Sequence, residues 1–313
     1  MSLANDPIAD VIALLRPRTV MAATLYASGP WAVRFDPYPH VKFGCVARGG
    51  CWLVVGRSKP VWLSEGDLFL LGNPPHYVLS SAPSVKPRAA KPLWSRAVDN
   101  QIRLGPVEEE ATSLCGGHFA FDGPNAPLLL DVLPTFVHVR ADEPQGKVLS
   151  QLGTLLGVEA RAGAPGGALV LERLAQIVLV YMLRAHAAQD TRPAGWLGAL
   201  GDARVGASLR AMHADVARRW GLDELAGLAG MSRTAFAVAF KSQVGSAPLE
   251  YLIQWRMSLA RDALRHDTHS ISELAFTIGY ESESAFSTAF RRVVGCSPKQ
   301  YRDRERATPA RVA

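Results

Sequence analysis

Two stretches near the C-terminus place hydroxyl, carboxylate and cationic side chains at helical spacing, where they could contact nucleic acid. The first stretch holds Arg233, Thr234, Ala237, Val238 and Lys241, and the second holds Glu283, Ser284, Ser287, Thr288, Arg291 and Arg292. Hydroxyls hydrogen-bond base edges, a glutamate accepts from cytosine N4, and small apolar groups pack against thymine methyls. The cations suit phosphate contacts, which add affinity without sequence information.

The residues around these positions repeat with a fixed offset along the chain. The first copy contains Ser232, Phe236, Phe240, Val244, Gly245, Pro248 and Tyr251, and the second contains Ser282, Phe286, Phe290, Val294, Gly295, Pro298 and Tyr301. A self-match at one period defines an architectural unit that is used twice. The phenylalanines stand at i and i+4, so we expect them to share a helix face and hold each helix on its scaffold.

Each copy predicts a helix, a glycine-containing turn and a second helix. The first helices are expected at Leu222–Ala229 and Ile271–Ile278, and the second begin after Ser232 and Ser282, which suit N-caps. The turn is one residue longer in the second copy. In such a helix-turn-helix unit, the second helix enters the major groove of DNA.

The segment Pro248–Arg265 predicts a helix that joins the two units. Its apolar residues are expected to point inward and Arg256, Arg261 and Arg265 outward, which adds Arg256 to the candidate DNA contacts. At about 1.5 Å per residue the helix spans roughly 25 Å. This is the right order to hold two recognition helices about one DNA turn, roughly 34 Å, apart. One chain could then contact two successive major-groove segments of double-stranded DNA.

The region from Ser208 to Arg302 resembles the DNA-binding domain of the AraC/XylS family of transcription regulators. The matching residues are Leu225, Ala226, Gly230, Met231, Ser232, Phe236, Phe240, Gly245, Pro248, Tyr251, Leu252, Trp255, Arg256, Ala260, Leu264, Ile271, Ala275, Gly279, Tyr280, Ser282, Phe286, Phe290, Gly295, Ser297, Pro298, Tyr301 and Arg302. The resemblance implies an all-helical domain with two helix-turn-helix motifs.

Charge and length favour a DNA-binding module attached to a second domain. The chain has 313 residues, and from Arg192 onward it holds 17 Lys and Arg against 12 Asp and Glu. The preceding part is nearly neutral, so the basic excess lies in the C-terminal third. The N-terminus does not show the order of a signal peptide, and the longest apolar run, Ile177–Leu183, is too short to span a bilayer. We therefore expect a cytoplasmic protein with no membrane segment.

The N-terminal part predicts a short helix at Ile8–Leu15 and then many short strands. The strand-like segments are Trp31–Phe35, Cys51–Val55, Val61–Leu63, Asp67–Leu71 and His76–Leu79, separated by Gly and Pro, and 84–100 is expected to be an exposed loop. This spacing is typical of an antiparallel sandwich or barrel. Residues 143–188 are expected to be helical. Within them Ala168–Ala187 is apolar nearly all round, so it packs inside its own domain or also meets a copy of itself.

These patterns together predict an α+β protein of two domains. Residues 1–190 form the first, including the helical dimerisation or linker segment 143–188. Residues 191–203 form a linker, and 204–306 form the DNA-binding domain.

The first domain resembles the cupin-like regulatory domain of one branch of the AraC/XylS family. The matching residues are His40, Val41, Gly50, Cys51, Trp52, Leu53, Gly66, Asp67, Leu68, His76, Cys115, Gly116, Gly117, His118 and Phe119. The resemblance implies a small β-barrel that holds an effector pocket, with His40, Trp52, His76, Cys115 and His118 as candidate lining residues. One departure is plain: where metal-dependent cupins have a histidine two residues after the first, this chain has Lys42.

The histidines leave three alternatives open for the barrel. His40, His76 and His118 could converge on a zinc or copper ion, since imidazole suits both metals. They could instead line a pocket for an organic effector or form hydrogen bonds within the barrel. A cysteine among Cys45, Cys51 and Cys115 could sense an oxidant if its thiol had a low pKa. No cofactor is required by any of these interpretations except the metal.

The sequence therefore predicts a DNA-binding transcription regulator, not an enzyme, that responds to a small-molecule, metal or oxidant effector. A homodimer and a monomer are both compatible with the sequence. Two alternatives stay open. One is a cupin-type metal-dependent enzyme that carries a DNA-binding tail, and the other is a constitutive DNA-binding protein whose barrel only dimerises. Activation and repression are both open.

Overall fold

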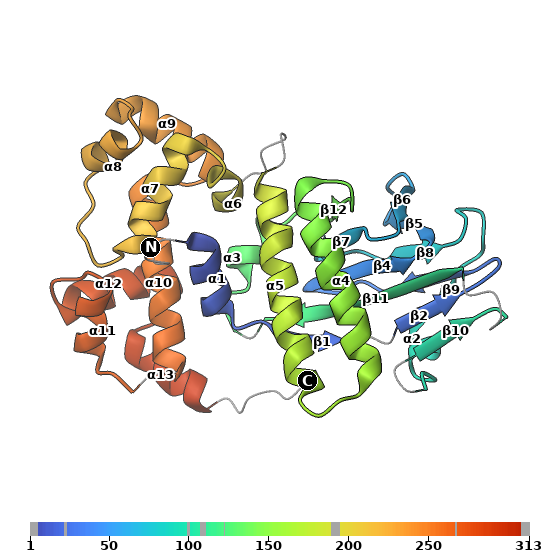
Figure 1. The fold of residues 1–313 in the computed structure, drawn as a ribbon. Helices are drawn as coiled ribbons and strands as arrows, with labels where there is room; N and C mark the ends of the chain where they lie inside the picture. The colour runs from blue at the N-terminus through green and yellow to red at the C-terminus, as the bar shows by residue number, and fades with distance from the viewer. Residues whose placement is uncertain are drawn as a thin grey trace. The chain divides into compact units, whose positions relative to one another are not determined.

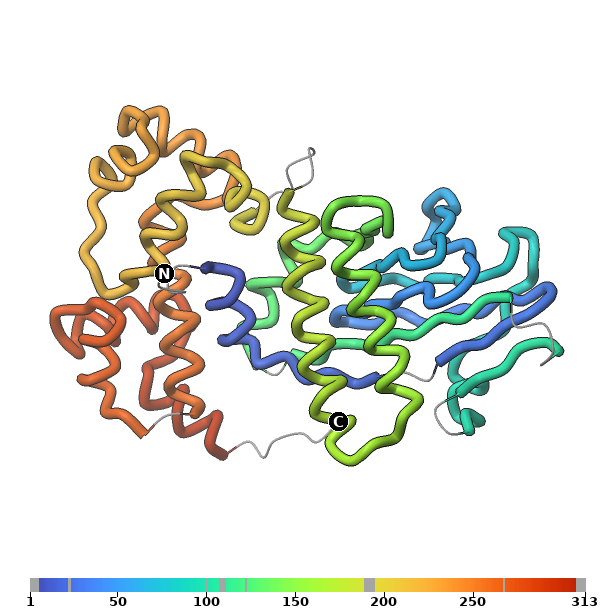
Figure 2. The backbone as a smooth tube through the Cα atoms, in the orientation of Figure 1, coloured from blue at the N-terminus to red at the C-terminus, as the bar shows by residue number. Residues whose placement is uncertain are grey.

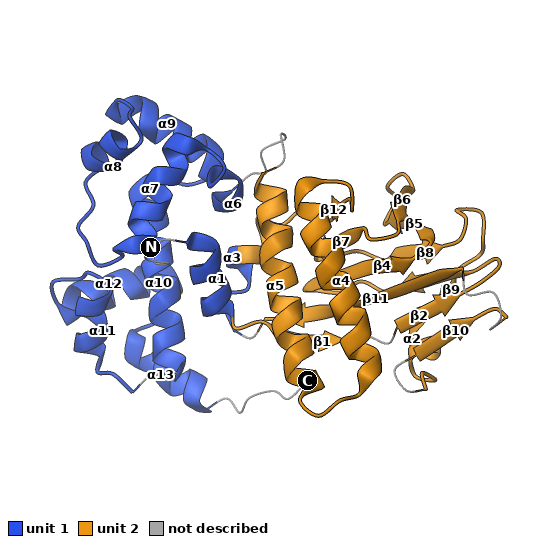
Figure 3. Ribbon diagram, in the orientation of Figure 1, with its two compact units in different colours: residues 1–15, 123–128, 190–313 blue, residues 16–122, 129–189 orange. Residues whose placement is uncertain are grey.

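The protein is described from a computed structural model that covers residues 6–21, 24–98, 101–106, 111–121, 123–188, 195–266 and 268–307. The ribbon and the backbone path are drawn in Figures 1 and 2. Two compact units divide the chain (Figure 3): unit 1 comprises residues 1–15, 123–128 and 190–313, and unit 2 comprises residues 16–122 and 129–189. Each unit is described by itself.

Unit 2 is built on two β-sheets. The larger sheet holds β1 (Arg18–Met21), β2 (Thr24–Ala27), β4 (Val41–Arg48), β7 (Leu68–Gly72), β10 (Gln101–Leu104), β11 (Thr112–Ala120) and β12 (Val137–Val139). The smaller sheet holds β3 (Ala32–Phe35), β5 (Gly50–Val55), β6 (Val61–Ser64), β8 (Tyr77–Ser80) and β9 (Arg88–Ala89). Both are mainly antiparallel, and β10 and β9 add parallel edge pairings.

The two sheets share one apolar core. Residues such as Val46, Phe69 and Leu114 from the larger sheet pack with Leu53 and Leu79 from the smaller one. Alternation along each strand explains this arrangement, because every second side chain points to the same face. The predicted strands are confirmed to within about one residue at their ends, and the expected antiparallel sandwich or barrel is the observed architecture.

Two long helices cover the opposite face of the larger sheet. Helices α4 (Pro144–Ala162) and α5 (Gly167–Ala187) run side by side, with α4 against β4, β7 and β11 and α5 against β1 and β12 (Figure 1). A close approach requires glycine at one position, since a Cβ on Gly153 would overlap the sulfur of Cys45. The buried residues of α5 include Ala175, Val178 and Leu179. Its other side stays exposed, so the helix is not buried all round.

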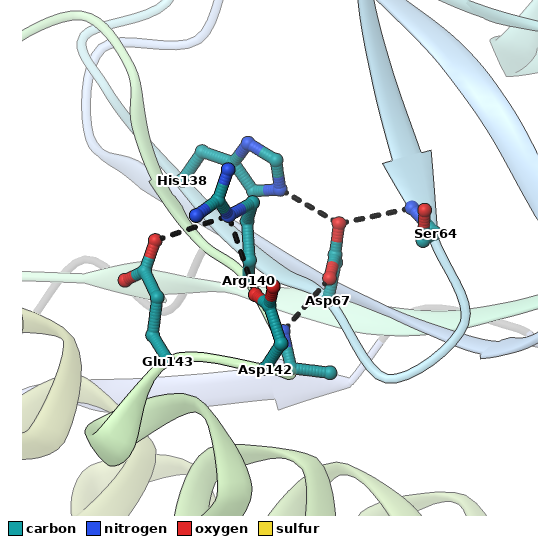
Figure 4. A network of polar contacts seen from close by, with 7 residues as sticks. Ser64, Asp67, His138, Arg140, Asp142 and Glu143 are labelled. Atoms are coloured by element: carbon teal, nitrogen blue, oxygen red, sulfur yellow. Dashed lines mark hydrogen bonds and ion pairs between the residues drawn. The ribbon is translucent and has the colours of Figure 1, made fainter.

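A buried carboxylate joins the turn before β7 to the entrance of α4. Asp67 accepts hydrogen bonds from the backbone N–H groups of Ser64 and Ala141, both at 2.9 Å, and lies 2.8 Å from His138 Nε2 (Figure 4). Arg140, Asp142 and Glu143 form an exposed cluster beside it. A buried carboxylate with several donors holds its surroundings in one geometry. The Gly66–Asp67 motif thus has a structural use here.

The regular structure of unit 1 is helical in the part of the chain that the structure describes. Its helices are α1 (Pro7–Leu15), α6 (Trp196–Ala199), α7 (Ala203–Ala214), α8 (Leu222–Leu228), α9 (Arg233–Val244), α10 (Pro248–His266), α11 (Ile271–Thr277), α12 (Glu283–Val294) and α13 (Pro298–Ala307). Two apolar clusters fill it. One gathers residues of α7, α8, α9 and the start of α10, and the other gathers the rest of α10 with α11, α12 and α13. Helix α10 is shared by both clusters and joins them.

Two segments from the N-terminal part of the chain pack within unit 1. On α1, Asp10 lies 3.0 Å from Nδ1 of His213 on α7, whose Nε2 lies 2.8 Å from the hydroxyl of Tyr251. In the segment 123–128, the Asn125 amide donates to the Ser258 carbonyl at 3.0 Å. Each of the two units is therefore made of more than one segment of the chain.

Part of the predicted linker has regular structure. Residues 191–194 lie outside the described residues, but Trp196 to Ala199 form α6, where Trp196 and Leu197 are buried and Trp196 donates to the Leu128 carbonyl at 2.8 Å. The segment 84–98, expected to be a loop, includes β9 and the short helix α2 (Ala90–Trp94). Within the described residues, no helix combines the length and apolar content needed to cross a membrane.

Candidate DNA interface and effector cavity

The two recognition helices begin with the same capping contact. The Ser232 hydroxyl accepts from the Ala235 N–H at the start of α9, and the Ser282 hydroxyl accepts from the Ala285 N–H at the start of α12. Each helix ends at a glycine in the left-handed region, Gly245 at φ 93° and Gly295 at φ 89°. These are the N-cap and C-cap residues that terminate helices most effectively. The local sequence thus sets the length of both helices.

A repeated aromatic cluster fixes each recognition helix to its scaffold. Phe236 and Phe240 lie edge to face with centroids 5.6 Å apart, and Phe240 meets Tyr251 at 5.9 Å. In the second unit, Phe286, Phe290 and Tyr301 reproduce the arrangement at 5.5 Å and 5.6 Å. All four phenylalanines are completely buried. They therefore hold the helices in place, as the i, i+4 spacing predicts, and are not available to stack on bases.

The outward face of α9 is small and partly apolar. Arg233, Thr234, Val238 and Lys241 are exposed and Ala237 is half-buried. Val238 is 66% exposed, which is unusual for a valine on a helix that has a packed face. Arg233 also lies 3.3 Å from Asp223 of α8 in an exposed ion pair. An exposed methyl-bearing surface of this kind suits thymine methyl groups.

The outward face of α12 is polar. Glu283, Ser284, Thr288, Arg291 and Arg292 are exposed and Ser287 is half-buried. The hydroxyls stand along the same helix face as the glutamate, and the two arginines occupy its last turn. Hydrogen-bonding groups at the start and cations at the end are suited to bases and to backbone phosphates, respectively.

Arg256 differs from the other candidate DNA contacts. It was expected to face outward on α10, but it is only 8% exposed. Its guanidinium donates to the carbonyls of Val216 and Arg218, both at 2.8 Å, and so satisfies the loop that follows α7. The reason for its burial is the loop packing against α10, which leaves two carbonyls that need donors. Arg261 is half-buried on the same helix.

The turns inside the two units close in the same way but have different surroundings. Met231 N–H donates to Ala226 and Tyr280 N–H to Ala275, so both first helices end in the same backbone pattern. Gly230 (φ 61°) has open space at its Cβ position, whereas a Cβ on Gly279 (φ 85°) would overlap the Ala217 carbonyl. The second turn is one residue longer, as the sequence predicts.

Unit 2 contains a cavity of about 500 Å³ that opens between the two sheets. Aromatic and aliphatic side chains, including Phe35, Phe69 and Trp94, form most of its wall. The polar side chains of Tyr38, Lys42 and His118 lie together in the lining. Ligand sites in proteins have this size and this mixture of apolar wall and few polar groups.

Only some of the pocket residues predicted from the sequence lie in the cavity lining. Cys115 and His118 are in the cavity lining; His40, Trp52 and His76 are not. His40 and His118 both contact the ring of Tyr38, at 5.5 Å and 5.0 Å between centroids, while Trp52 meets Trp62 on the smaller sheet and His76 is exposed. Among the described residues, no three or more His, Cys, Asp or Glu side chains are grouped as metal ligands. A metal at His40, His76 and His118 stays a prediction.

Two of the cysteines are direct partners across the larger sheet. Cys45 on β4 pairs with Cys115 on β11, and the Cys115 thiol lies 3.8 Å from the Gly153 carbonyl of α4. The hydrogen bond to Cys115, together with burial, raises the pKa of the Cys45 thiol well above its usual range. Burial also raises the pKa of Cys51 to about 12. Cysteine redox sensing by these residues stays a prediction.

The sequence interpretation missed Tyr38, Lys42 and Trp94 as cavity residues. A signal for Lys42 was present in a segment not named as a strand, because Lys42 and Gly44 alternate with the apolar residues Val41, Phe43 and Cys45 and would share a face of a strand. Trp94 gave no such signal, since it lies in a segment expected to be an exposed loop.

Comparisons with known protein families agree with the two-part architecture. Residues 6–188 match the family model described as Cupin, and residues 225–304 match the model described as Helix-turn-helix domain. The predicted combination of a cupin-like sheet domain with an all-helical domain holding two helix-turn-helix motifs is thereby confirmed.

Two curated relatives match most of the chain. A protein of Streptomyces lividans named as an AraC-like transcription regulator is 41% identical over 281 residues, which cover 89% of this chain and 92% of that protein. A protein of Streptomyces antibioticus with the same name is 39% identical over the same coverage. Among solved structures, the DNA-binding domain of AdpA in complex with a target DNA matches at 32% identity with a TM-score of 0.33, covering 34% of this chain and 97% of that one.

Proposed function

The chain belongs to the family of AraC-like DNA-binding transcription regulators, and we propose that an effector bound in its cupin domain controls its binding to DNA. The observation that most supports effector control is the cavity of about 500 Å³ in unit 2. The observation that supports sequence-specific binding is the pair of capped helices, α9 and α12, whose outward faces are exposed. We propose the cytoplasm, where regulator and DNA meet, as its location.

Control requires the effector to bind one arrangement of the protein better than another. The segments 6–15 and 123–128 are suited to this coupling, because they are joined in sequence to unit 2 and packed within unit 1. A change in unit 2 that displaced either segment would act on α7 through Asp10 or on α10 through Asn125.

DNA binding is tested by titrating the full chain onto its own promoter region at several salt concentrations. We expect the affinity to fall steeply with salt and to exceed that for a shuffled sequence, because phosphate contacts release counterions while base contacts select sequence. An affinity that did not change with salt concentration, or that was equal for the promoter and the shuffled sequence, would contradict the proposal. Effector control is tested by screening metabolites, metals and oxidants for a rise in melting temperature, and then for a change in promoter affinity.

We further propose that the protein forms a homodimer through α4 and α5. Leu155 (52% exposed) on α4 and Leu169 (57% exposed) on α5 belong to an apolar set on the solvent side of these helices, and such sets mark interaction surfaces. Sedimentation of the Leu155→Glu, Leu169→Glu double variant should show a monomer where the parent is a dimer. Val98→Glu, at an apolar position of unit 2 that is 70% exposed, serves as the control and should stay dimeric.

The competing function is a cupin-type metal-dependent enzyme that carries a DNA-binding domain. It predicts stoichiometric metal after purification and turnover that a chelator abolishes. We propose that the protein has no catalytic activity, and metal analysis combined with promoter binding before and after chelation separates the two functions.

A further inference from the structure

The cavity of unit 2 has a polar end and an apolar end, and the strand register explains both. Across β4 and β11 the paired residues are Lys42 with His118, Gly44 with Gly116, and Val46 with Leu114. Residues two apart on a strand share a face, so these three pairs form a row along the inner face of the larger sheet. Val46 and Leu114 belong to the apolar core, and Lys42 and His118 stand at the other end of the row.

The middle of the row consists of Gly44 and Gly116, and neighbouring atoms occupy the positions that their side chains would take. A Cβ on Gly44 would overlap the ring of Phe69, and a Cβ on Gly116 would overlap the backbone of β4. Glycine at position 44 therefore lets the Phe69 ring approach β4 closely, and Phe69 forms part of the cavity wall.

The polar end holds one half-buried cation and two neutral donors. The Lys42 ammonium lies 4.4 Å from the centroid of the Tyr38 ring, and the His118 ring lies 5.0 Å from the same ring. Burial, followed by the charges of Lys42 and His40, lowers the pKa of His118 to about 4, so at neutral pH it is uncharged and has one N–H to donate. Burial raises the pKa of Tyr38, which keeps its hydroxyl protonated.

Lys42 carries a half-buried ammonium group in the cavity lining. Burial alone lowers its pKa, and among the described residues no carboxylate forms an ion pair with it. The carboxylate of Asp36 is in the lining but is exposed. A half-buried cation that lies over an aromatic ring is stabilised when an anion binds beside it.

The apolar end is suited to a flat or extended hydrocarbon group. Phe35 stacks on Tyr77 with centroids 4.5 Å apart and planes 5° from parallel, and Trp94 meets Phe35 edge to face at 5.1 Å. These rings form a rigid wall, since each is held by its neighbour.

We propose that the cavity binds a small carboxylic acid with an aromatic or alkyl body. The carboxylate accepts from Lys42, His118 and Tyr38, and the body lies against Phe35, Phe69 and Trp94. A carboxylate fits better than a phosphate because no arginine is among the described lining residues, and arginine is the residue that pairs with phosphate in two-point geometry. This inference rests on the proposed function, since it names the chemical class of the effector for the same domain.

The test compares acids with their matched amides on the full-length protein. Binding of 1-naphthoate and octanoate, and of 1-naphthamide and octanamide, is measured by calorimetry and by melting temperature. We expect each acid to bind at least about tenfold more tightly than its amide, since a hydrogen bond to a charged group has about that effect. Lys42→Met should abolish this preference, and Lys91→Met, at an exposed lining position, should leave it intact.

A second variant keeps the test decisive if Lys42→Met does not fold. Tyr38→Phe retains the ring below the ammonium and removes the hydroxyl, so it should reduce acid binding and leave amide binding unchanged. Equal binding of acids and amides to the parent protein, or no binding of any of the four probes, would overturn the proposal, as would an acid preference that survives Lys42→Met. Promoter binding measured on the same samples separates the outcomes, because a protein that binds its promoter but no acid retains the proposed regulatory function with a different effector.

Discussion

The two helix-turn-helix units of unit 1 have the same scaffold and different outward surfaces. Both have a serine cap, a buried aromatic triple and a terminal left-handed glycine, with centroid distances that agree to within a few tenths of an ångström. Their exposed faces differ: Val238 and Thr234 on α9 stand against Thr288 and Glu283 on α12. Packing constrains the inner residues because a core tolerates little change in volume, whereas the outer residues are free to diverge toward different base sequences.

The largest expected effect tests whether the scaffolds are equivalent. Phe236→Ala and Phe286→Ala each remove a fully buried ring, so each should lower the free energy of unfolding by about 3–5 kcal/mol. Thermal unfolding of the full chain measures the loss, and hydrogen exchange assigns it to α8 and α9 or to α11 and α12. If the two losses of unfolding free energy differed by more than about 2 kcal/mol, the width of the expected range, one aromatic cluster would contribute far more than the other. The two scaffolds would then not be equivalent.

Substitutions in the turns of the two units should differ in their effect on unfolding free energy, although substitutions in the two scaffolds should not. Gly279→Ala combines a left-handed backbone with an overlap against the Ala217 carbonyl, so it should cost more than about 3 kcal/mol of unfolding free energy. Gly230→Ala meets open space and should cost about 1 kcal/mol from the backbone conformation alone. Chemical denaturation of both variants decides the matter. Equal losses would mean that the loop containing Ala217 moves aside without cost.

The outward faces of α9 and α12 should differ in how they select DNA sequences. Thr288→Ala in the second unit is expected to relax base selection at one position by about 1–3 kcal/mol, because a hydroxyl that hydrogen-bonds a base edge is lost. Val238→Ala in the first unit should have a smaller effect, confined to positions with a thymine methyl. Affinities for a library with single base changes measure both. The opposite order, with Val238 the stronger determinant, would reverse the assignment of specificity to the second unit.

Sequence reasoning recovered what regular periodicity and local chemistry determine. The caps Ser232 and Ser282, the buried phenylalanines and the limits of β3, β5, β6, β7 and β8 follow from spacing alone. Arg256 shows where such reasoning fails, since a helix-face argument places it outward and only tertiary packing brings the carbonyls of Val216 and Arg218 to it. The packing of α1 in unit 1 likewise depends on a contact between Asp10 and His213 that are 203 positions apart.

A pocket in the N-terminal domain was expected from the resemblance, but most of its lining residues were not. Resemblance pointed to histidines, and the structure places His118 in the lining beside Tyr38 and Lys42. Lys42 had been noted only as a departure from a metal-binding pattern. The residues of a pocket come from several strands and a loop, so their grouping depends on register, which a single sequence does not state.

The smallest expected effect is a change in the salt dependence of DNA affinity. It distinguishes cations that contact phosphate from a cation that stabilises the fold. Arg291→Met and Lys241→Met should each weaken binding to all DNA sequences alike, and each should reduce the slope of log affinity against log salt by about 0.9. Equal changes are expected, because both residues are exposed in the last turn of their recognition helices. Arg256→Met is the matched control: its guanidinium is bound to two carbonyls, so the variant should lose about 1.5–3 kcal/mol of stability and keep the parent salt slope at temperatures where it is folded. If Arg256→Met instead lowered the slope while Arg291→Met did not, the phosphate-contacting surface would lie on α10, and the two recognition helices could not be placed on DNA as their exposed faces indicate.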